Sequence, residues 1–245
     1  MKDQDTHALA HDHGLTVPDG IEQYLPHLIA TIGPDMVLPE LDLFQAERAL
    51  SLFSTAAGSE IFLPMLSATY SDAARAAQPY WPSLTRGEES AGGWSWVQID
   101  PPERQLRIWI GEDGCVRIDA AIGETRGGVD LVHLDTVGAL VREAIFISLL
   151  LHPAENDVAW SLAVRLNNAS GRFGGVRWPL DDLSLLSRLR IPDTTQVYER
   201  TTAATTAQLR DTPWVATRDL LQDLLTMLGV ADGPFTAPIQ ETADR

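Results

Sequence analysis

Several polar side chains in the middle of the chain could support acid–base chemistry. His133 lies between Asp130 and Asp135, and a carboxylate beside an imidazole is the basis of general acid–base catalysis. The run that begins at Val129 alternates apolar and polar residues, which also fits a strand that ends in a polar residue. Asp130, His133 and Asp135 are therefore the candidate catalytic residues, with a structural role as the alternative.

A group of histidines near the N-terminus could bind a metal ion. His7, His11 and His13 lie close together, with Asp12 between two of them. Neutral imidazoles and carboxylates are ligands for transition metals. The spacing matches no established metal site, and the polar segment 1–15 is expected to be a disordered tail. We therefore expect adventitious metal affinity at most, and no cofactor.

A glycine-rich segment combines cations with aromatic rings. Residues 172–178 read Arg-Phe-Gly-Gly-Val-Arg-Trp, and such a loop could hold an anion or stack on a base. A plain connection between strands explains the same residues, because loops often keep arginines for solubility. Arg172, Arg177 and Trp178 are the candidate ligand contacts.

Two scarce residue types exclude several kinds of catalytic site. Lys2 is the only lysine, so the chain has no Gly-Lys pair for a Walker-type phosphate loop. Cys115 is the only cysteine, which excludes an intramolecular disulfide and any multi-cysteine zinc or iron–sulfur site. The Gly-x-Ser-x-Gly and His-Glu-x-x-His motifs are also absent. These absences favour a non-catalytic role over an enzyme.

The composition indicates where the protein works and which partners it avoids. With 18 basic and 34 acidic side chains the formal net charge is −16, which repels nucleic-acid phosphates and anionic membranes. Nucleic acid is therefore not an expected partner. The longest apolar stretch, 144–151, is too short to span a membrane, and residues 1–14 lack the apolar centre of a signal peptide. We expect a cytoplasmic protein, and the preference for arginine over lysine suggests a bacterial source.

Hydrophobic periodicity predicts an α+β protein, in which N-terminal helices precede a mostly antiparallel sheet that packs on a buried central helix and a C-terminal helix. The expected segments are a disordered tail over 1–15, a helical segment over 16–78, a linker over 79–93, an α+β domain over 94–230 and a disordered tail over 231–245. Whether the helical segment is a separate domain stays open. Its expected helices span 21–32, 41–57 and 59–77, and the second has an apolar stripe of Leu43, Phe44, Leu50 and Phe53.

Capping and apolar patterns predict the two helices of the α+β domain. The stretch 136–151 should form the buried central helix, with Asp135 as its N-cap. Thr212 and Pro213 should begin the final helix. Residues expected to be buried in the central helix are Leu140, Val141, Ala144, Ile145 and Leu149. Alternation predicts strands at 94–100, 106–110, 116–120, 158–166 and 197–201.

Parity predicts the register of the hairpin formed by 106–110 and 116–120. The apolar residues of both strands share a face only if Ile110 lies opposite Val116, which leaves a three-residue loop that ends at Gly114. The opposite face then sets Trp109 against Arg117 and Arg107 against Asp119. If that face is open, Arg107, Trp109 and Arg117 form the candidate interaction surface.

Parts of the second half resemble a known group of proteins. The stretches 159–164 (Ala-Trp-Ser-Leu-Ala-Val), 197–209 (Val-Tyr-Glu-Arg-Thr-Thr onward) and 220–229 carry the resemblance. They resemble the C-terminal region of actinobacterial proteins whose N-terminal part is a Schlafen-type, AlbA-like domain associated with DNA or ATP binding. The likeness covers residues 94–230, and the Schlafen-type half has no counterpart in this chain. The resemblance therefore implies no nucleotide function and assigns no functional residue.

Two functional hypotheses follow from the sequence. The first is a non-catalytic protein-interaction or regulatory module that binds a protein partner or forms a homo-oligomer. The alternative is a ligand-binding or hydrolytic enzyme domain that uses Asp, His and Arg residues in an unrecognised pocket. Convergence of Asp130, His133, Arg172 and Arg177 in one cleft would favour the alternative.

Overall fold

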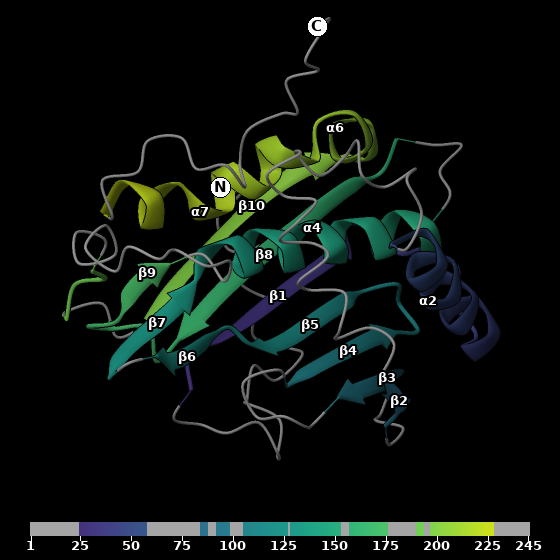
Figure 1. The fold of residues 1–245 in the computed structure, drawn as a ribbon. Helices are drawn as coiled ribbons and strands as arrows, with labels where there is room; N and C mark the ends of the chain where they lie inside the picture. Colours follow the sequence, from purple (N-terminus) through teal and green to yellow (C-terminus); the bar gives the residue numbers. More distant parts are fainter. Residues whose placement is uncertain are drawn as a thin grey trace, which may run out of the picture.

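The computed structural model describes residues 25–57, 84–87, 92–98, 105–126, 128–152, 157–175, 190–193 and 197–227. Within these ranges the protein has the predicted α+β fold, with a larger and a smaller β-sheet and helices packed against them (Figure 1). The expected tails, the expected helix at 59–77 and residues His7, His11, His13, Arg177 and Trp178 lie outside the described residues.

The larger sheet is antiparallel throughout the described residues. Its strands are β1 (His27–Pro34), β2 (Thr85–Arg86), β3 (Gly93–Gln98), β4 (Leu106–Gly111), β5 (Val116–Ala121), β8 (Ala159–Asn167) and β10 (Val197–Thr205). They lie in the order β10-β8-β1-β5-β4-β3-β2. The strand that comes first in the described sequence, β1, thus lies inside the sheet, between β8 and β5.

The helices are α2 (Leu43–Ala57), α4 (Leu134–Leu151), α6 (Thr206–Asp211) and α7 (Pro213–Met227). α4 packs on β1 and β5 and also contacts α2 and α7, while α7 covers β8 and β10. Figure 1 shows α4, α6 and α7 on the same side of the larger sheet and α2 at one end of the molecule. α4 is therefore the buried central helix that the sequence predicts. Leu140, Val141, Ala144 and Ile145 are buried as expected, but Leu149 is only half-buried.

A smaller sheet lies beside the N-terminal end of α4. It consists of β6 (Gly123–Arg126), β7 (Val129–His133) and β9 (Phe173–Gly175), in the order β6-β7-β9. β7 pairs with β6 in antiparallel fashion and with β9 in parallel fashion. Because β7 ends at His133 and α4 begins at the next residue, this sheet places candidate polar residues at a helix terminus.

The register predicted for the hairpin of β4 and β5 is confirmed. Ile110 lies opposite Val116 and Ile108 opposite Ile118, and all four are fully buried. The amide of Gly111 donates to the carbonyl of Cys115, which closes the three-residue loop, and Gly114 has the expected positive φ of 82°.

The helix predicted at 21–32 is wrong, because residues 27–34 form β1. β1 lies between β5 and β8, and its residues are buried on both faces of the sheet as far as Gly33. A strand with two buried faces has no apolar–polar alternation, so its apolar residues also fit helical spacing. The segment predicted to be helical thus contributes an interior strand of the sheet.

Several smaller expectations also need correction. α4 begins at Leu134, with His133 rather than Asp135 at the N-cap, because β7 runs directly into the helix. The expected linker contains β2, and the glycine-rich stretch before residue 176 contains β9. The short helix α6 follows β10 without a gap, and a capping box between Thr205 and Gln208 begins it. Pro213 is the first residue of α7, as predicted.

Candidate functional site

The candidate catalytic residues of the smaller sheet do not converge. Asp130 lies 3.7 Å from Arg172, and the Thr125 hydroxyl donates to its carboxylate at 2.5 Å. His133 lies instead beside Glu124, with 3.7 Å between Nε2 and Oε1. Since neighbouring residues of a strand point to opposite faces, the Asp130–Arg172 pair and the His133–Glu124 pair lie on opposite faces of the sheet. Asp135 is in the first turn of α4.

The His133–Glu124 pair is the part of this region that most resembles acid–base machinery. His133 is buried at the point where β7 meets α4, and Glu124 approaches it from β6. Neither group forms a cluster with a further metal ligand, because no group of three or more such side chains occurs among the described residues.

The single cysteine is not a nucleophile candidate. Cys115 lies in the hairpin after Gly114 and is 1% exposed. Burial raises the pKa of its thiol to about 12, so the reactive thiolate is not populated near neutral pH.

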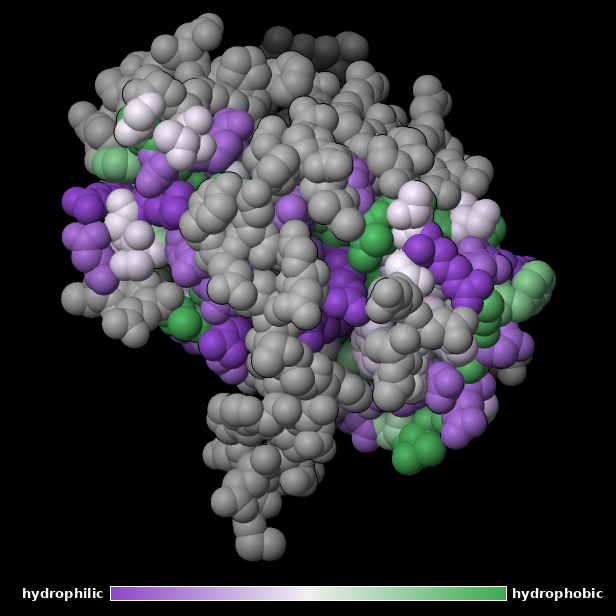
Figure 2. All heavy atoms as spheres, turned by 90° about the horizontal axis from the view of Figure 1, so that it is seen from below, coloured by the Kyte–Doolittle hydropathy of each residue, from purple (hydrophilic) through white to green (hydrophobic). Residues whose placement is uncertain are grey.

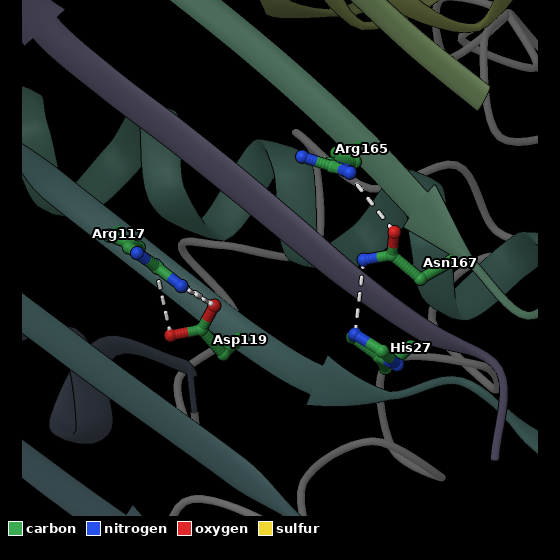
Figure 3. Close-up of polar contacts among 5 residues, drawn as sticks. All are labelled: His27, Arg117, Asp119, Arg165 and Asn167. Carbon is green, nitrogen blue, oxygen red and sulfur yellow. Dashed lines mark hydrogen bonds and ion pairs between the residues drawn. The ribbon is translucent and has the colours of Figure 1, made fainter. Parts of the chain in front are cut away.

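The larger sheet carries charged residues on the face opposite α4. One row crosses five neighbouring strands and contains Glu199, Arg165, Ile29, Asp119 and Arg107 in that order. Figure 3 shows part of this face, with α4 behind the strands. Its centre is buried, since Ile29 and Asp119 are each 1% exposed. The sequence reveals these charges, but the strand order that aligns them depends on β1.

Arg117 and Asp119 form a buried ion pair on this face (Figure 3). Nε of Arg117 donates to both carboxylate oxygens, at 2.9 and 3.1 Å, and Nη2 donates to Oδ1 at 2.8 Å. Burial raises the pKa of Asp119, and the guanidinium of Arg117 opposes this effect. Both partners are buried and bound to each other, so the pair resembles a structural contact more than an open binding site.

A chain of hydrogen bonds lies next to this ion pair. Nε of Arg165 donates to Oδ1 of Asn167 at 3.1 Å, and Nδ2 of Asn167 lies 3.0 Å from Nε2 of His27 (Figure 3). Nδ1 of His27 lies 3.3 Å from the carbonyl of Leu25. The amide nitrogen of Asn167 can only donate and the carbonyl of Leu25 can only accept. Nε2 of His27 therefore accepts and Nδ1 donates, which fits a neutral imidazole with its proton on Nδ1. Burial lowers the pKa of His27, consistent with the same state.

The predicted interaction surface is only partly accessible. Arg117 is 6% exposed and holds Asp119, whereas Arg107 and Trp109 are half-buried. A Cβ built on Gly93 would come within 2.8 Å of the Trp109 ring, and one built on Gly111 within 2.7 Å. The indole therefore lies over two facing glycines of β3 and β4. Arg117 does not offer an accessible side chain to a partner.

A stretch of exposed apolar side chains was missed from the sequence. Met36, Val37, Phe44 and Leu52 are 54%, 97%, 71% and 47% exposed. Of the predicted apolar stripe of α2, Leu50 is buried and Leu43 is half-buried, but Phe44 is exposed, and Ala46 and Ala49 are buried beside Leu50. The buried side of α2 therefore carries small alanines, while the large Phe44 in its first turn lies on the exposed side. Helical spacing alone does not reveal which of two apolar stripes faces the core.

The loop that carries Met36 and Val37 is held in place by backbone contacts at both of its ends. The amide of Asp35 donates to the carbonyl of Ala159, and the amide of Leu41 donates to the carbonyl of Glu112. Asp42 and Gln45 form a reciprocal capping box at the start of α2, with both bonds at 2.8 Å. The loop that precedes α2 is thus fixed before any partner binds.

Comparisons with known proteins give no further assignment. Among the described residues, no helix is long and apolar enough to cross a membrane. No protein-family model, no curated protein and no solved structure matches the chain.

Proposed function

We propose that this protein is a non-catalytic protein-interaction module, and that its contact surface includes Met36, Val37, Phe44 and Leu52, here called the 36–52 surface. The supporting observation is the concentration of exposed apolar side chains. Six large apolar residues of the described part are exposed, and four of them come from residues 36–52. Single exposed apolar residues are common, but a concentration of them is typical of interaction sites.

The position of the surface supports this proposal. α2 lies at one end of the molecule in Figure 1, and apolar and hydrophilic side chains are mixed along the same end in Figure 2. A partner could therefore approach without displacing a strand of either sheet. The fixed loop before α2 lowers the ordering cost of binding.

The arrangement of the candidate catalytic residues also favours a non-catalytic role. Asp130 and His133 lie on opposite faces of the smaller sheet, and the thiol of Cys115 is buried and protonated. On the charged face of the larger sheet, Arg117 and Asp119 bind each other, and Arg165, Asn167 and His27 form an internal chain of hydrogen bonds.

Co-purification with matched variants tests the proposal. The full chain is expressed with a tag in its source cell, as wild type, as Val37→Ser/Phe44→Ser and as Val197→Ser/Met227→Ser. Val197 and Met227 are 42% and 41% exposed and lie on β10 and α7. Their substitution therefore controls for the loss of exposed apolar side chains in general. We expect a stoichiometric protein that co-purifies with wild type and the control but not with the first variant. Equal recovery with all three chains, or recovery with none, would contradict the proposal.

The alternative function, a ligand-binding or hydrolytic domain, is favoured by one observation. The buried imidazole of His133 lies next to a carboxylate at the N-terminal end of α4. If this pair binds a small molecule, native mass spectrometry of the purified chain should detect a bound mass, and His133→Asn should remove it. A wild-type spectrum with only the mass of the chain would count against this alternative.

A further inference from the structure

The charges around the 36–52 surface indicate the chemistry of the partner, provided that the proposed function holds. Residues 35–52 contain four carboxylates and one cation, so their formal charge is 1 − 4 = −3. The acidic residues are Asp35, Glu40, Asp42 and Glu47, and all four are exposed. The apolar side chains of the surface therefore lie within an acidic stretch.

Internal contacts neutralise only part of this charge. Asp35 accepts a hydrogen bond from Ser161, and Asp42 caps α2 through the amide of Gln45, so neither carboxylate is paired with a cation by these bonds. Glu47 lies 3.9 Å from Arg86, and both side chains are more than two-fifths exposed. An ion pair of this length at the surface is weak and easily exchanged. The carboxylates are thus available to a cationic partner.

We propose that the 36–52 surface binds a basic amphipathic helix of a partner protein. Phe44 and Leu52 are eight residues apart on α2, which places them about 12 Å apart along the helix axis. Two to three turns of a partner helix span this distance, and apolar residues at i, i+4 and i+7 would reach both anchors. Lysine or arginine residues on the flanks of the same helix would meet Glu40 and Glu47.

The same charges disfavour a second copy of this chain as the occupant. A symmetric contact through this surface would bring two stretches of charge −3 together, in chains that each carry −16. Like charges across an interface oppose association. An anionic membrane is disfavoured for the same reason.

Peptide binding to the full chain tests the proposed partner chemistry. The probe is a labelled Leu/Lys peptide of roughly 18 residues with leucines at helical spacing, long enough to form a helix. Two control peptides are used: one with the same composition in scrambled order, and one with Glu in place of Lys. Fluorescence anisotropy gives the dissociation constants at about 50 and 300 mM salt.

We expect the amphipathic Leu/Lys peptide to bind at least about tenfold more tightly than either control peptide. Val37→Ser/Phe44→Ser should weaken its binding by about tenfold or more, whereas Val197→Ser/Met227→Ser should leave it unchanged. Glu40→Gln/Glu47→Gln should weaken binding mainly at low salt. Unchanged melting temperatures would show that the variants remain folded.

Four results would overturn the inference. Equal binding of the scrambled peptide would indicate general attraction to a polyanion, and equal binding of the Glu peptide would show that the carboxylates play no part. A wild-type dimer in light scattering that Val37→Ser/Phe44→Ser dissociates would assign the surface to a second copy. If the cellular partner is lost with Val37→Ser/Phe44→Ser while the Leu/Lys peptide fails to bind, the interaction function stands and only the partner chemistry fails.

Discussion

Arg117 and Asp119 show how one residue pair on a sheet can be charged and yet buried. The hairpin register predicts that both side chains share a face, since they are two positions apart on β5. The register also sets Arg107 opposite Asp119, and the structure confirms this alignment. The register alone does not predict whether Asp119 binds Arg107 or Arg117. The choice depends on which side chains are buried, and burial depends on how the rest of the chain packs. Arg117 makes the contact along its own strand.

Removal of one member of this pair should cost more than removal of both. Arg117→Met leaves the carboxylate of Asp119 buried without its guanidinium, so we expect the free energy of unfolding to fall by about 3–5 kcal/mol. The double variant Arg117→Met/Asp119→Leu leaves no buried charge and should be much closer to wild type. Urea unfolding of Arg117→Met, Asp119→Leu and the double variant measures the free energy that each loses relative to wild type. Additive losses in the double variant would refute this account.

The neutral state of His27 predicts a loss of stability at acidic pH. Burial lowers the pKa of His27. The nearby cations Arg165 and Arg117 lower it further, whereas the carboxylate of Asp119 raises it. In the unfolded chain this histidine binds a proton near its ordinary pKa of about 6.5, whereas in the folded chain it binds one only at lower pH. The free energy of unfolding therefore has its full value above this pH and declines below it. His152, whose pKa burial also lowers, acts with the same sign.

The contribution of His27 can be separated by substitution. His27→Gln cannot take up a proton, so its free energy of unfolding should decline less than that of wild type between pH 8 and pH 5.5. Urea midpoints at several pH values give the comparison, and the difference of the two curves isolates His27 from His152. Parallel curves for wild type and His27→Gln would show that the hydrogen-bond chain through Asn167 tolerates protonation.

At the scale of the elements, the hairpin and β1 mark what the sequence can and cannot predict. The hairpin of β4 and β5 has one buried apolar face and clear alternation, so parity alone predicts its register. β1 is buried on both faces, and no alternation separates a strand from a helix. The exposed position of Phe44 was missed for a related reason, since the buried stripe of α2 consists mainly of alanines. Local pattern is informative where the two faces of an element differ in polarity, as apolar and charged residues do along β5, even though both of its faces are buried.

The hairpin loop depends on Gly114 for two separate reasons. Its φ of 82° is strained for any residue with a Cβ, at a cost of roughly 1–2 kcal/mol. A Cβ there would also overlap Nε2 of His152, whose ring lies 5.6 Å from that of Trp160. Gly92 is the matched control, because its φ is 79° and a Cβ would meet nothing within 4 Å.

We therefore expect Gly114→Ala to lower the free energy of unfolding by clearly more than Gly92→Ala does. In a His152→Ala background, the cost of Gly114→Ala should fall to that of Gly92→Ala. Thermal or urea unfolding of the four variants checks both expectations. Equal costs for the two glycines in the wild-type background would show that the ring of His152 moves aside freely.

At the scale of the whole molecule, the sheet joins two parts of the chain that composition separates. The proline- and glycine-rich stretch 79–93 looks like a boundary, yet β1 comes before it and β3, β4, β5, β8 and β10 come after it. β1 pairs along eight residues with β8 and along six with β5. Without β1, the pair β10-β8 would be separated from the other four strands of the larger sheet, and the edges of β8 and β5 would be exposed.

A chain that starts at residue 79 should therefore fail to reach the native state, although it keeps all seven tryptophans. Near-ultraviolet circular dichroism compares the tryptophan packing of this fragment with that of the full chain. We expect the fragment to lose the signal and to unfold without a cooperative transition, because β5 and β8 lack the strand that both contact. Addition of a separate peptide of residues 25–57, which supplies β1 and α2, should restore part of the signal. A fragment that melts cooperatively with a native tryptophan spectrum on its own would instead make 79–93 a true domain boundary and β1 a dispensable addition.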